Sequence, residues 1–166
     1  MLLLRFARTT PVSGLQAGSV VVVQGRVVPR KLLKIANTPL DCVYHETVIE
    51  EWRRGVRGGR AMWTPAAGDE ELEPFEVEDA TGRVLVWPEP GQVTVRGGRN
   101  ERGAGKRGGT RYVTRYIGVG DVVRVRGLVR VPPAPKKGKP RAPIEIAPPN
   151  GGKLVVLFRK RGAPPP

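Results

Sequence analysis

The stretch at residues 74–87, Pro-Phe-Glu-Val-Glu-Asp-Ala-Thr-Gly-Arg-Val-Leu-Val-Trp, has the pattern of a β-hairpin. Phe75 and Val77 alternate with glutamates, which is typical of a strand with one buried and one solvated face. Residues 79–82 supply a turn, because aspartate can accept a hydrogen bond from the backbone two residues on and glycine tolerates a positive φ. Residues 83–87 resume as a strand rich in β-branched side chains. An isolated hairpin is marginal in water, so further strands must cover its apolar face.

Several other segments have the composition of strands, and none shows a convincing helical period. Turns rich in glycine and proline separate them, which is typical of an antiparallel barrel or sandwich. Gly25 interrupts a valine-rich strand and is expected to mark a bulge or bend. The predicted strands are 19–28, 41–53, 75–79, 83–87, 111–117 and 122–131, with a further short strand at 92–96 and a last hairpin formed by 143–147 and 154–158. For residues 112–116 one helical turn is an equal alternative. The residues predicted to face the interior are Phe75, Val77, Val84, Val86, Val123, Val125 and Val129.

This pattern predicts an all-β chain, a single OB-like antiparallel β-barrel with long basic loops. With 166 residues the chain suits one domain and is long enough to bury a core. Residues 64–73 are expected to be a polar, acidic connection. The predicted division is an N-terminal segment at 1–18, the barrel at 19–158 with a flexible insertion at 97–110 and a flexible linker at 132–143, and a disordered tail at 159–166.

The chain is strongly basic, with 29 Lys and Arg against 15 Asp and Glu and a net charge of +14. The charge is uneven, because residues 69–79 contain seven acidic side chains and no basic one. The positive charge elsewhere favours polyanions such as nucleic acid, an anionic membrane surface or an acidic protein. The alternative is compositional, since abundant Arg, Gly, Pro, Ala and Val also result from a GC-rich genome without selection for binding.

Basic residues gather in several loops and on one strand face, with aromatic residues nearby in the sequence. Basic loops with aromatic stacking platforms are the means by which OB folds hold single-stranded nucleic acid. Two alternatives stay open: the tryptophans pack in the core or at the barrel rim, and the strand arginines pair with the acidic face of the hairpin. The candidate polyanion-binding residues are Arg53, Arg54, Arg57, Arg60, Arg99, Arg102, Lys106, Arg107, Arg124, Arg126 and Arg130. The candidate stacking residues are Tyr44, Trp52 and Trp87.

No residue pattern in the sequence points to catalysis or to a metal centre. Cys42 and His45 are the only cysteine and histidine, so an internal disulfide and a Cys-based zinc site are excluded. Because they are three apart on a predicted strand, we expect them on opposite faces, as a core thiol and a surface imidazole. Glu76 and Glu78 share one strand face, and we interpret them as solvated rather than as a divalent-ion site. We therefore expect a protein that is not an enzyme and has no cofactor and no metal.

The hydrophobic content of the chain indicates a soluble protein. Apolar residues make up 39% of the sequence, and the mean hydropathy is −0.29. The apolar opening at residues 1–4 is too short for a signal peptide or a transmembrane helix. We therefore predict a cytoplasmic protein with no transmembrane segment.

Several segments together resemble one family of β-barrel domains. The hairpin at 75–86 and Gly-Asp-Val-Val-Arg-Val-Arg-Gly at 120–127 follow each other in the order found in OB-fold barrels. With Thr-Pro-Leu-Asp-Cys-Val-Tyr at 38–44, Trp52 and the late Pro-Pro-Asn-Gly-Gly at 148–152 followed by apolar residues, they resemble the GIDE/MULAN domain, also called "beside a membrane". The resemblance extends over residues 18–158.

The resemblance implies a β-barrel that binds or regulates something near a membrane. In that family the domain lies between transmembrane helices and, in eukaryotic members, precedes a RING finger that makes a membrane ubiquitin ligase. This sequence has no membrane helix and no RING ligand set, so ligase activity is not implied. Our prediction is a non-catalytic GIDE-like adaptor module for a protein partner or an anionic membrane surface, cytoplasmic or peripheral to a membrane. The alternative is a single-stranded nucleic-acid-binding OB-fold protein that uses basic loops and aromatic stacking.

Overall fold

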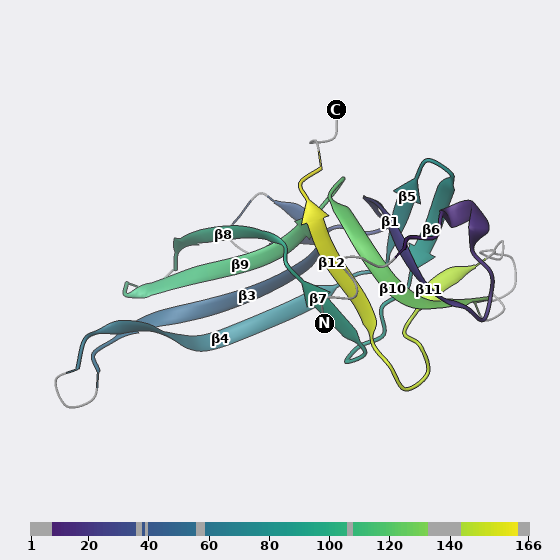
Figure 1. Cartoon of the computed structure of the whole chain (residues 1–166). Coiled ribbons are helices and arrows are strands. Elements are labelled where there is room, and N and C mark those ends of the chain that lie inside the picture. Colours follow the sequence, from purple (N-terminus) through teal and green to yellow (C-terminus); the bar gives the residue numbers. More distant parts are fainter. Residues whose placement is uncertain are drawn as a thin grey trace, which may run out of the picture.

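The structure, a computed structural model, describes residues 8–35, 38, 40–55, 59–105, 108–132 and 144–162. These residues form twelve strands and one short 3-10 helix, η1 (Val12–Gly14), and contain no α-helix. Figure 1 shows a barrel from which a long sheet projects. In the described part of the chain, no helix is long and apolar enough to cross a membrane.

A closed barrel of five strands forms the body of the protein. β1 (Val20–Pro29) pairs with β5 (Phe75–Asp79) on one side and with β10 (Val122–Arg130) on the other. β5 forms the predicted hairpin with β6 (Gly82–Val86), and β11 (Glu145–Ala147) closes the ring between β6 and β10. The β6–β11 pairing is parallel and the other four are antiparallel. The predicted all-β barrel is confirmed, with one parallel pair that the sequence pattern did not predict.

The barrel core consists mainly of valines from alternate positions of its strands. All seven residues predicted to face the interior are at most 2% exposed, because each lies on the inward side of β5, β6 or β10. Val131, which continues the same alternation, is instead 45% exposed, since β10 ends at Arg130. The alternation of the sequence therefore predicts the buried side of each strand correctly as far as the strand extends.

The hairpin turn and the bend in β1 depend on particular residues. Asp79 Oδ1 accepts hydrogen bonds from the backbone N–H groups of Thr81 and Gly82, at 2.7 and 3.1 Å, which confirms the predicted turn. The other carboxylate oxygen of Asp79 accepts from Val12 N at 2.9 Å, so the turn also holds η1 on the barrel. At Gly25 a Cβ would lie 2.2 Å from a backbone carbonyl oxygen of β5, so only glycine allows β1 to approach there.

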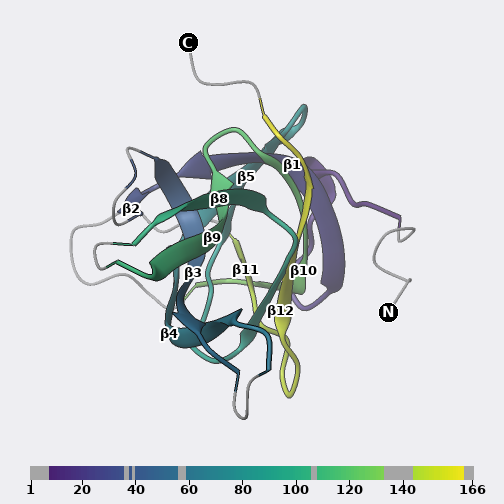
Figure 2. The same ribbon diagram turned by 90° about the vertical axis from the view of Figure 1, so that its left-hand side faces the viewer.

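A second sheet projects from the barrel, and we call it the arm. Its strands are β3 (Asp41–Arg53), β4 (Met62–Leu72), β8 (Arg99–Ala104) and β9 (Thr110–Gly118), in the spatial order β4-β3-β9-β8. The short strand β2 (Leu33–Lys34) pairs with the beginning of β3. Figure 2, turned so that the arm points toward the viewer, shows the barrel strands behind it.

The base of the arm is anchored by packing on both of its faces. Tyr44 and Ile117 are fully buried and belong to the same apolar cluster as the barrel valines. On the other face, Cys42 and Tyr116 form a small second core with Leu33 and neighbouring apolar residues. The arm therefore shares its base with the barrel core, while its outer part lies beyond both clusters.

Three segments differ from the sequence-based predictions. Residues 64–72 are part of β4 rather than an irregular acidic connection, and residues 99–104 form β8 within the expected flexible insertion. The predicted last hairpin is wrong, because β11 and β12 (Leu154–Lys160) do not pair with each other. Each pairs instead with a different half of β10, and β12 also pairs in parallel with β7 (Val93–Arg96).

The expected disordered tail at 159–166 is wrong for its first four residues, 159–162. β12 continues through Lys160, and the N–H of Gly162 donates to the side chain of Asp121. The expected linker at 132–143 and the last four residues of the tail lie outside the described residues, apart from Pro132.

Candidate binding surfaces

The far end of the arm carries an aromatic and basic group of side chains, which we call the tip cluster: Trp52, Trp63 and Arg111. Trp52 and Trp63 are directly paired across β3 and β4, with ring centroids 5.3 Å apart and planes tilted by 59°. The Arg111 guanidinium lies 4.4 Å from the centroid of the Trp63 ring and is ion-paired with Glu50. Trp52 stays 52% exposed. Cation–π and aromatic contacts thus hold Trp63 in place and leave Trp52 on the surface.

The predicted basic loop lies next to the tip cluster. Arg53 ends β3 and pairs with Glu51 at 2.7 Å, with 61% of its side chain exposed, so this pair contributes little stability. Arg54 and Arg60 are exposed on either side of the connection between β3 and β4. Arg57 lies outside the described residues. The placed arginines of this loop therefore face solvent at the end of the arm.

Polar contacts along one face of the arm involve Tyr44, which we had predicted as a stacking residue. Its hydroxyl donates to Glu70 Oε1 at 3.1 Å and accepts from Arg115 Nη2 at 3.1 Å, and Arg115 is ion-paired with Glu46. Tyr44 is fully buried, and this burial raises the pKa of its hydroxyl far above the ordinary value. The stacking prediction for Tyr44 is wrong, because no ligand can reach its ring.

The two other predicted stacking residues lie on different parts of the protein. Trp52 is in the tip cluster of the arm. Trp87 follows β6 on the barrel, is 41% exposed, and donates its backbone N–H to Ile146 O at 2.8 Å. The three aromatic residues therefore do not form one platform.

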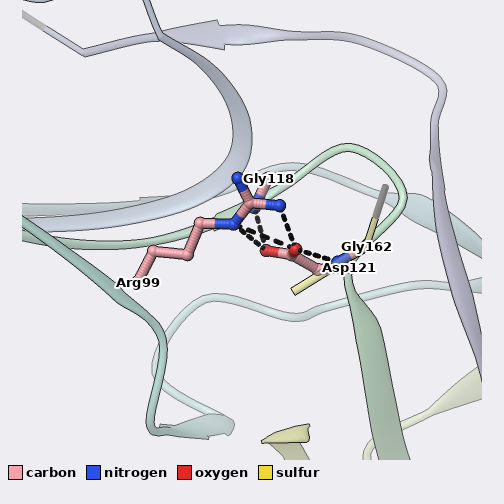
Figure 3. A network of polar contacts seen from close by, with 4 residues as sticks. All are labelled: Arg99, Gly118, Asp121 and Gly162. Carbon is pink, nitrogen blue, oxygen red and sulfur yellow. Dashed lines mark hydrogen bonds and ion pairs between the residues drawn. The ribbon is translucent and has the colours of Figure 1, made fainter. Parts of the chain in front are cut away.

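Arg99, predicted to bind a polyanion, instead holds a buried carboxylate (Figure 3). Its Nε lies 3.0 Å from both oxygens of Asp121, and its Nη2 also donates to this group. The N–H groups of Gly118 and Gly162 donate to the same carboxylate, each at 2.9 Å. Asp121 is fully buried and only 19% of the Arg99 side chain is exposed. The hydrogen bond to Asp121 raises the pKa of Arg99, so this arginine is a permanent structural cation that links β8, β12 and the turn before β10.

Of the other basic residues predicted for the insertion, only Arg102 belongs to the described part of the chain. Arg102 is exposed on β8 and remains a candidate surface cation. Lys106 and Arg107 lie outside the described residues. Because Arg99 is occupied by Asp121, the predicted basic group does not act as one loop.

The strand arginines of β10 also divide into two groups. Arg130 pairs with Glu145 and Glu89, at 2.7 and 2.8 Å, so it is neutralised at one end of the strand. Arg124 donates to Gln24 Oε1 at 2.6 Å, and Arg126 is exposed. The alternative that strand arginines pair with the acidic hairpin face does not hold for Arg130.

Sequence reasoning placed Arg124 and Arg126 on one strand face but missed the wider surface around them on the barrel exterior, which we call the basic face. It is formed by the outward residues of β1, β10, β12 and β7, four strands that contain no aspartate or glutamate. The alternation that predicted the inward valines could have identified it, but the pairing of β12 with both β10 and β7 was not predictable from spacing. Its outward residues include Val20, Val22, Arg96, Arg124, Arg126, Leu128, Val155, Leu157 and Lys160.

His45 is buried rather than exposed. Only 6% of its side chain is accessible, and its Nε2 lies 3.8 Å from Glu71 Oε2. Its Nδ1 has no hydrogen-bond partner among the residues that the structure describes. The prediction of a surface imidazole is therefore wrong. Cys42 is buried as expected, and burial raises the pKa of its thiol to about 12. Within the described residues, no three His, Cys, Asp or Glu side chains gather in a way that could hold a metal ion.

Comparisons with protein-family models, with curated proteins and with solved structures find no match to this chain. A functional assignment therefore depends on the surfaces described above.

Proposed function

We propose that this chain is a non-catalytic, GIDE-like β-barrel binding module that contacts an anionic protein or membrane surface through the end of its arm. The observation that carries the proposal is the tip cluster with its neighbouring arginines. Trp52 is half exposed, Met62 is 62% exposed, and Arg54 and Arg60 are exposed beside them. Apolar and cationic side chains are thus presented together at the end of a projecting element.

The barrel topology supports the OB-like part of the proposal. The ring order β1-β5-β6-β11-β10 consists of a three-strand meander followed by two strands that close the barrel, with one parallel contact between β6 and β11. This is the arrangement expected for a five-stranded Greek-key barrel of the OB type. Fold alone does not define a ligand, so the assignment of a partner depends on the exposed side chains.

The electrostatics of the tip favour an anionic partner. Arg111 is ion-paired with Glu50, and Arg53 forms an exposed, weak pair with Glu51. Arg54 and Arg60 make no ion pair with any residue that the structure describes. Tryptophan and methionine contribute apolar contact area. Arginine is enriched at interfaces because its guanidinium is weakly hydrated and donates several hydrogen bonds. The tip therefore combines apolar anchoring with attraction to negative charge.

The tip can be tested by its own fluorescence. The chain has three tryptophans, and the variant Trp87→Phe leaves only the two of the tip cluster as reporters. In this background we expect vesicles containing phosphatidylserine, or a polyglutamate peptide, to shift the emission to shorter wavelengths at low salt, and the shift to diminish as salt rises. Arg54→Ser with Arg60→Ser should reduce the shift, whereas Arg30→Ser, an exposed arginine on the barrel, should not.

The proposal fails if neither probe changes the emission, or if the tip variant and the Arg30→Ser control respond alike. The same titration with an oligothymidylate measures the second candidate function, single-strand binding. The exposed ring of Trp52 beside Arg54 favours that candidate, since bases stack on aromatic rings. Against it, the outer face of the β5–β6 hairpin carries Glu76 and Glu78, and in OB folds this region contributes to the nucleic-acid surface.

A further inference from the structure

The basic face of the barrel is a surface without negative charge, and nothing in the proposed tip contact makes use of it. β10 lies between β1 and β12, and β12 lies between β10 and β7. Outward residues therefore form rows across the four strands. One row reads Gln24, Arg124, Leu157 and Arg96, and the next reads Val22, Arg126, Val155 and Thr94.

The two rows place cations and aliphatic side chains in parallel stripes. Arg124 and Arg126 are two residues apart on β10, so their Cα atoms are separated by about 7 Å. Arg126 is paired with Val22 of β1 and Val155 of β12, and Arg124 with Gln24 and Leu157, each about 5 Å away in the direction of the strand pairing. Val20 continues the β1 row beside Leu128. Arg96 on β7 lies one strand beyond, and Lys160 is paired with Val122 at the end of the face.

The four strands of this face supply no carboxylate that could neutralise its cations. Arg126 makes no ion pair with any residue that the structure describes. At the border, Glu78 is paired with Arg83 at 2.7 Å, and Glu145 and Glu89 are paired with Arg130. These three border carboxylates are therefore already engaged with other arginines.

The aliphatic stripes need an explanation, because the barrel core is already complete on the inner side of these strands. Val20 is 49% exposed, while Val22, Leu128, Val155 and Leu157 are partly exposed. A nucleic-acid backbone would use the arginines but gain little from valine and leucine, and these four strands offer no outward aromatic ring for a base. A partner that presents carboxylates and aliphatic side chains side by side uses both features.

We propose that the basic face binds an acidic amphipathic helix of a partner protein. Carboxylates at positions i and i+4 of a helix are about 6 Å apart along its axis, which fits the spacing of Arg124 and Arg126. Leucines on the adjacent helix positions would lie against Val155 and Leu157, in the manner of a helix laid on an apolar groove. The inference extends the proposed function, since it names the chemistry of one protein partner for the binding module.

The probe is an 18-residue synthetic peptide with Glu at i and i+4 and Leu at the neighbouring positions, carrying a fluorescent label. Its binding to the whole chain is measured by fluorescence anisotropy across a salt series. We expect saturable binding that weakens as salt rises, and weaker binding of a peptide of the same composition in scrambled order. Arg124→Ser with Arg126→Ser should weaken binding about tenfold, the sum expected for two surface ion pairs. Leu157→Ser should weaken it about threefold through lost apolar contact.

The controls separate this inference from the tip proposal. Arg54→Ser with Arg60→Ser removes charge only at the tip and should weaken peptide binding much less than Arg124→Ser with Arg126→Ser does. Failure of the peptide to bind, equal binding of the scrambled peptide, or equal loss in the two double variants would overturn the inference. So would tighter binding of an oligothymidylate, or of phosphatidylserine vesicles, through Arg124 and Arg126. A normal tip response in the vesicle titration together with any of these results would leave the proposed function standing without this partner.

Discussion

Replacing Arg99 with alanine is expected to destabilise the protein by about 3–5 kcal/mol, the usual cost of removing one partner of a buried ion pair. Asp121 is fully buried, and its carboxylate receives Arg99 Nε and Nη2 together with two backbone N–H groups. The variant deletes the only cation among these donors and leaves a buried negative charge with two neutral hydrogen bonds. The uncompensated charge, rather than the number of lost contacts, dominates the cost.

Urea unfolding followed by tryptophan fluorescence measures this effect, with the midpoint and slope fitted separately. Arg102→Ala is the matched control, because Arg102 lies on the same strand and is exposed, and it should change stability by no more than about 0.5 kcal/mol. Asp121→Asn combined with Arg99→Ala should cost less than the sum of the two single changes, since both report the same interaction. If Arg99→Ala unfolds at the same urea concentration as Arg102→Ala, the assignment of Arg99 as a structural cation is wrong.

Two further predictions concern the barrel. Asp79→Ala should lower the free energy of unfolding by about 2 kcal/mol at pH 7. Although burial opposes ionisation, hydrogen bonds from Thr81, Val12 and Gly82 lower the pKa of the Asp79 carboxyl from its usual 3.8. The stabilisation by the ionised carboxylate is therefore present above pH 3.8 and is lost as the pH falls through the folded-state pKa. Urea unfolding of both proteins at pH 7 and pH 3 should show the difference shrinking in acid, and an undiminished difference would contradict the hydrogen-bond explanation. Gly25→Ala should lower the midpoint temperature of thermal unfolding by several degrees or prevent folding, because the added Cβ would lie 2.2 Å from a backbone oxygen of β5. An unchanged midpoint temperature would show that β1 and β5 can separate at this position.

The barrel could be predicted from the sequence because each of its longer strands has one buried apolar face and one solvent-facing side. Phe75, Val77, Val123 and Val125 alternate with polar residues, and that period specifies both the strand and its inner side. β11 was found as a strand, but its pairing with β6 was not. Three residues carry too little pattern to indicate a partner, and the parallel contact joins segments far apart in the sequence.

In the arm, β3 and β9 were predicted as strands, whereas β4 and β8 were missed because they do not bury an apolar face. In β4 residues 65–71 are all exposed, and β8 alternates between exposed and partly buried residues with charged and small side chains. Such strands form through pairing with β3 and β9 rather than through burial, so their composition resembles that of loops. The same cause explains the assignment of Arg99, since a residue counted among loop cations proved to be paired with an aspartate 22 positions later.

The distribution of charge in the structure changes what the net charge of +14 means for binding. Arginines on the arm are matched by glutamates on β3, as Arg115 is by Glu46 and Arg111 by Glu50. Among the arginines for which the described residues show no ion pair, Arg54 and Arg60 lie at the tip and Arg126 lies on the basic face. β3 contains 13 residues, which corresponds to about 40 Å of extended strand between the barrel end of the arm and its tip. A partner that bound both surfaces at once would therefore gain affinity from the second contact only if its own acidic sites were a comparable distance apart. Salt should weaken the two contacts independently, so substitutions at one surface should leave the salt dependence of the other unchanged.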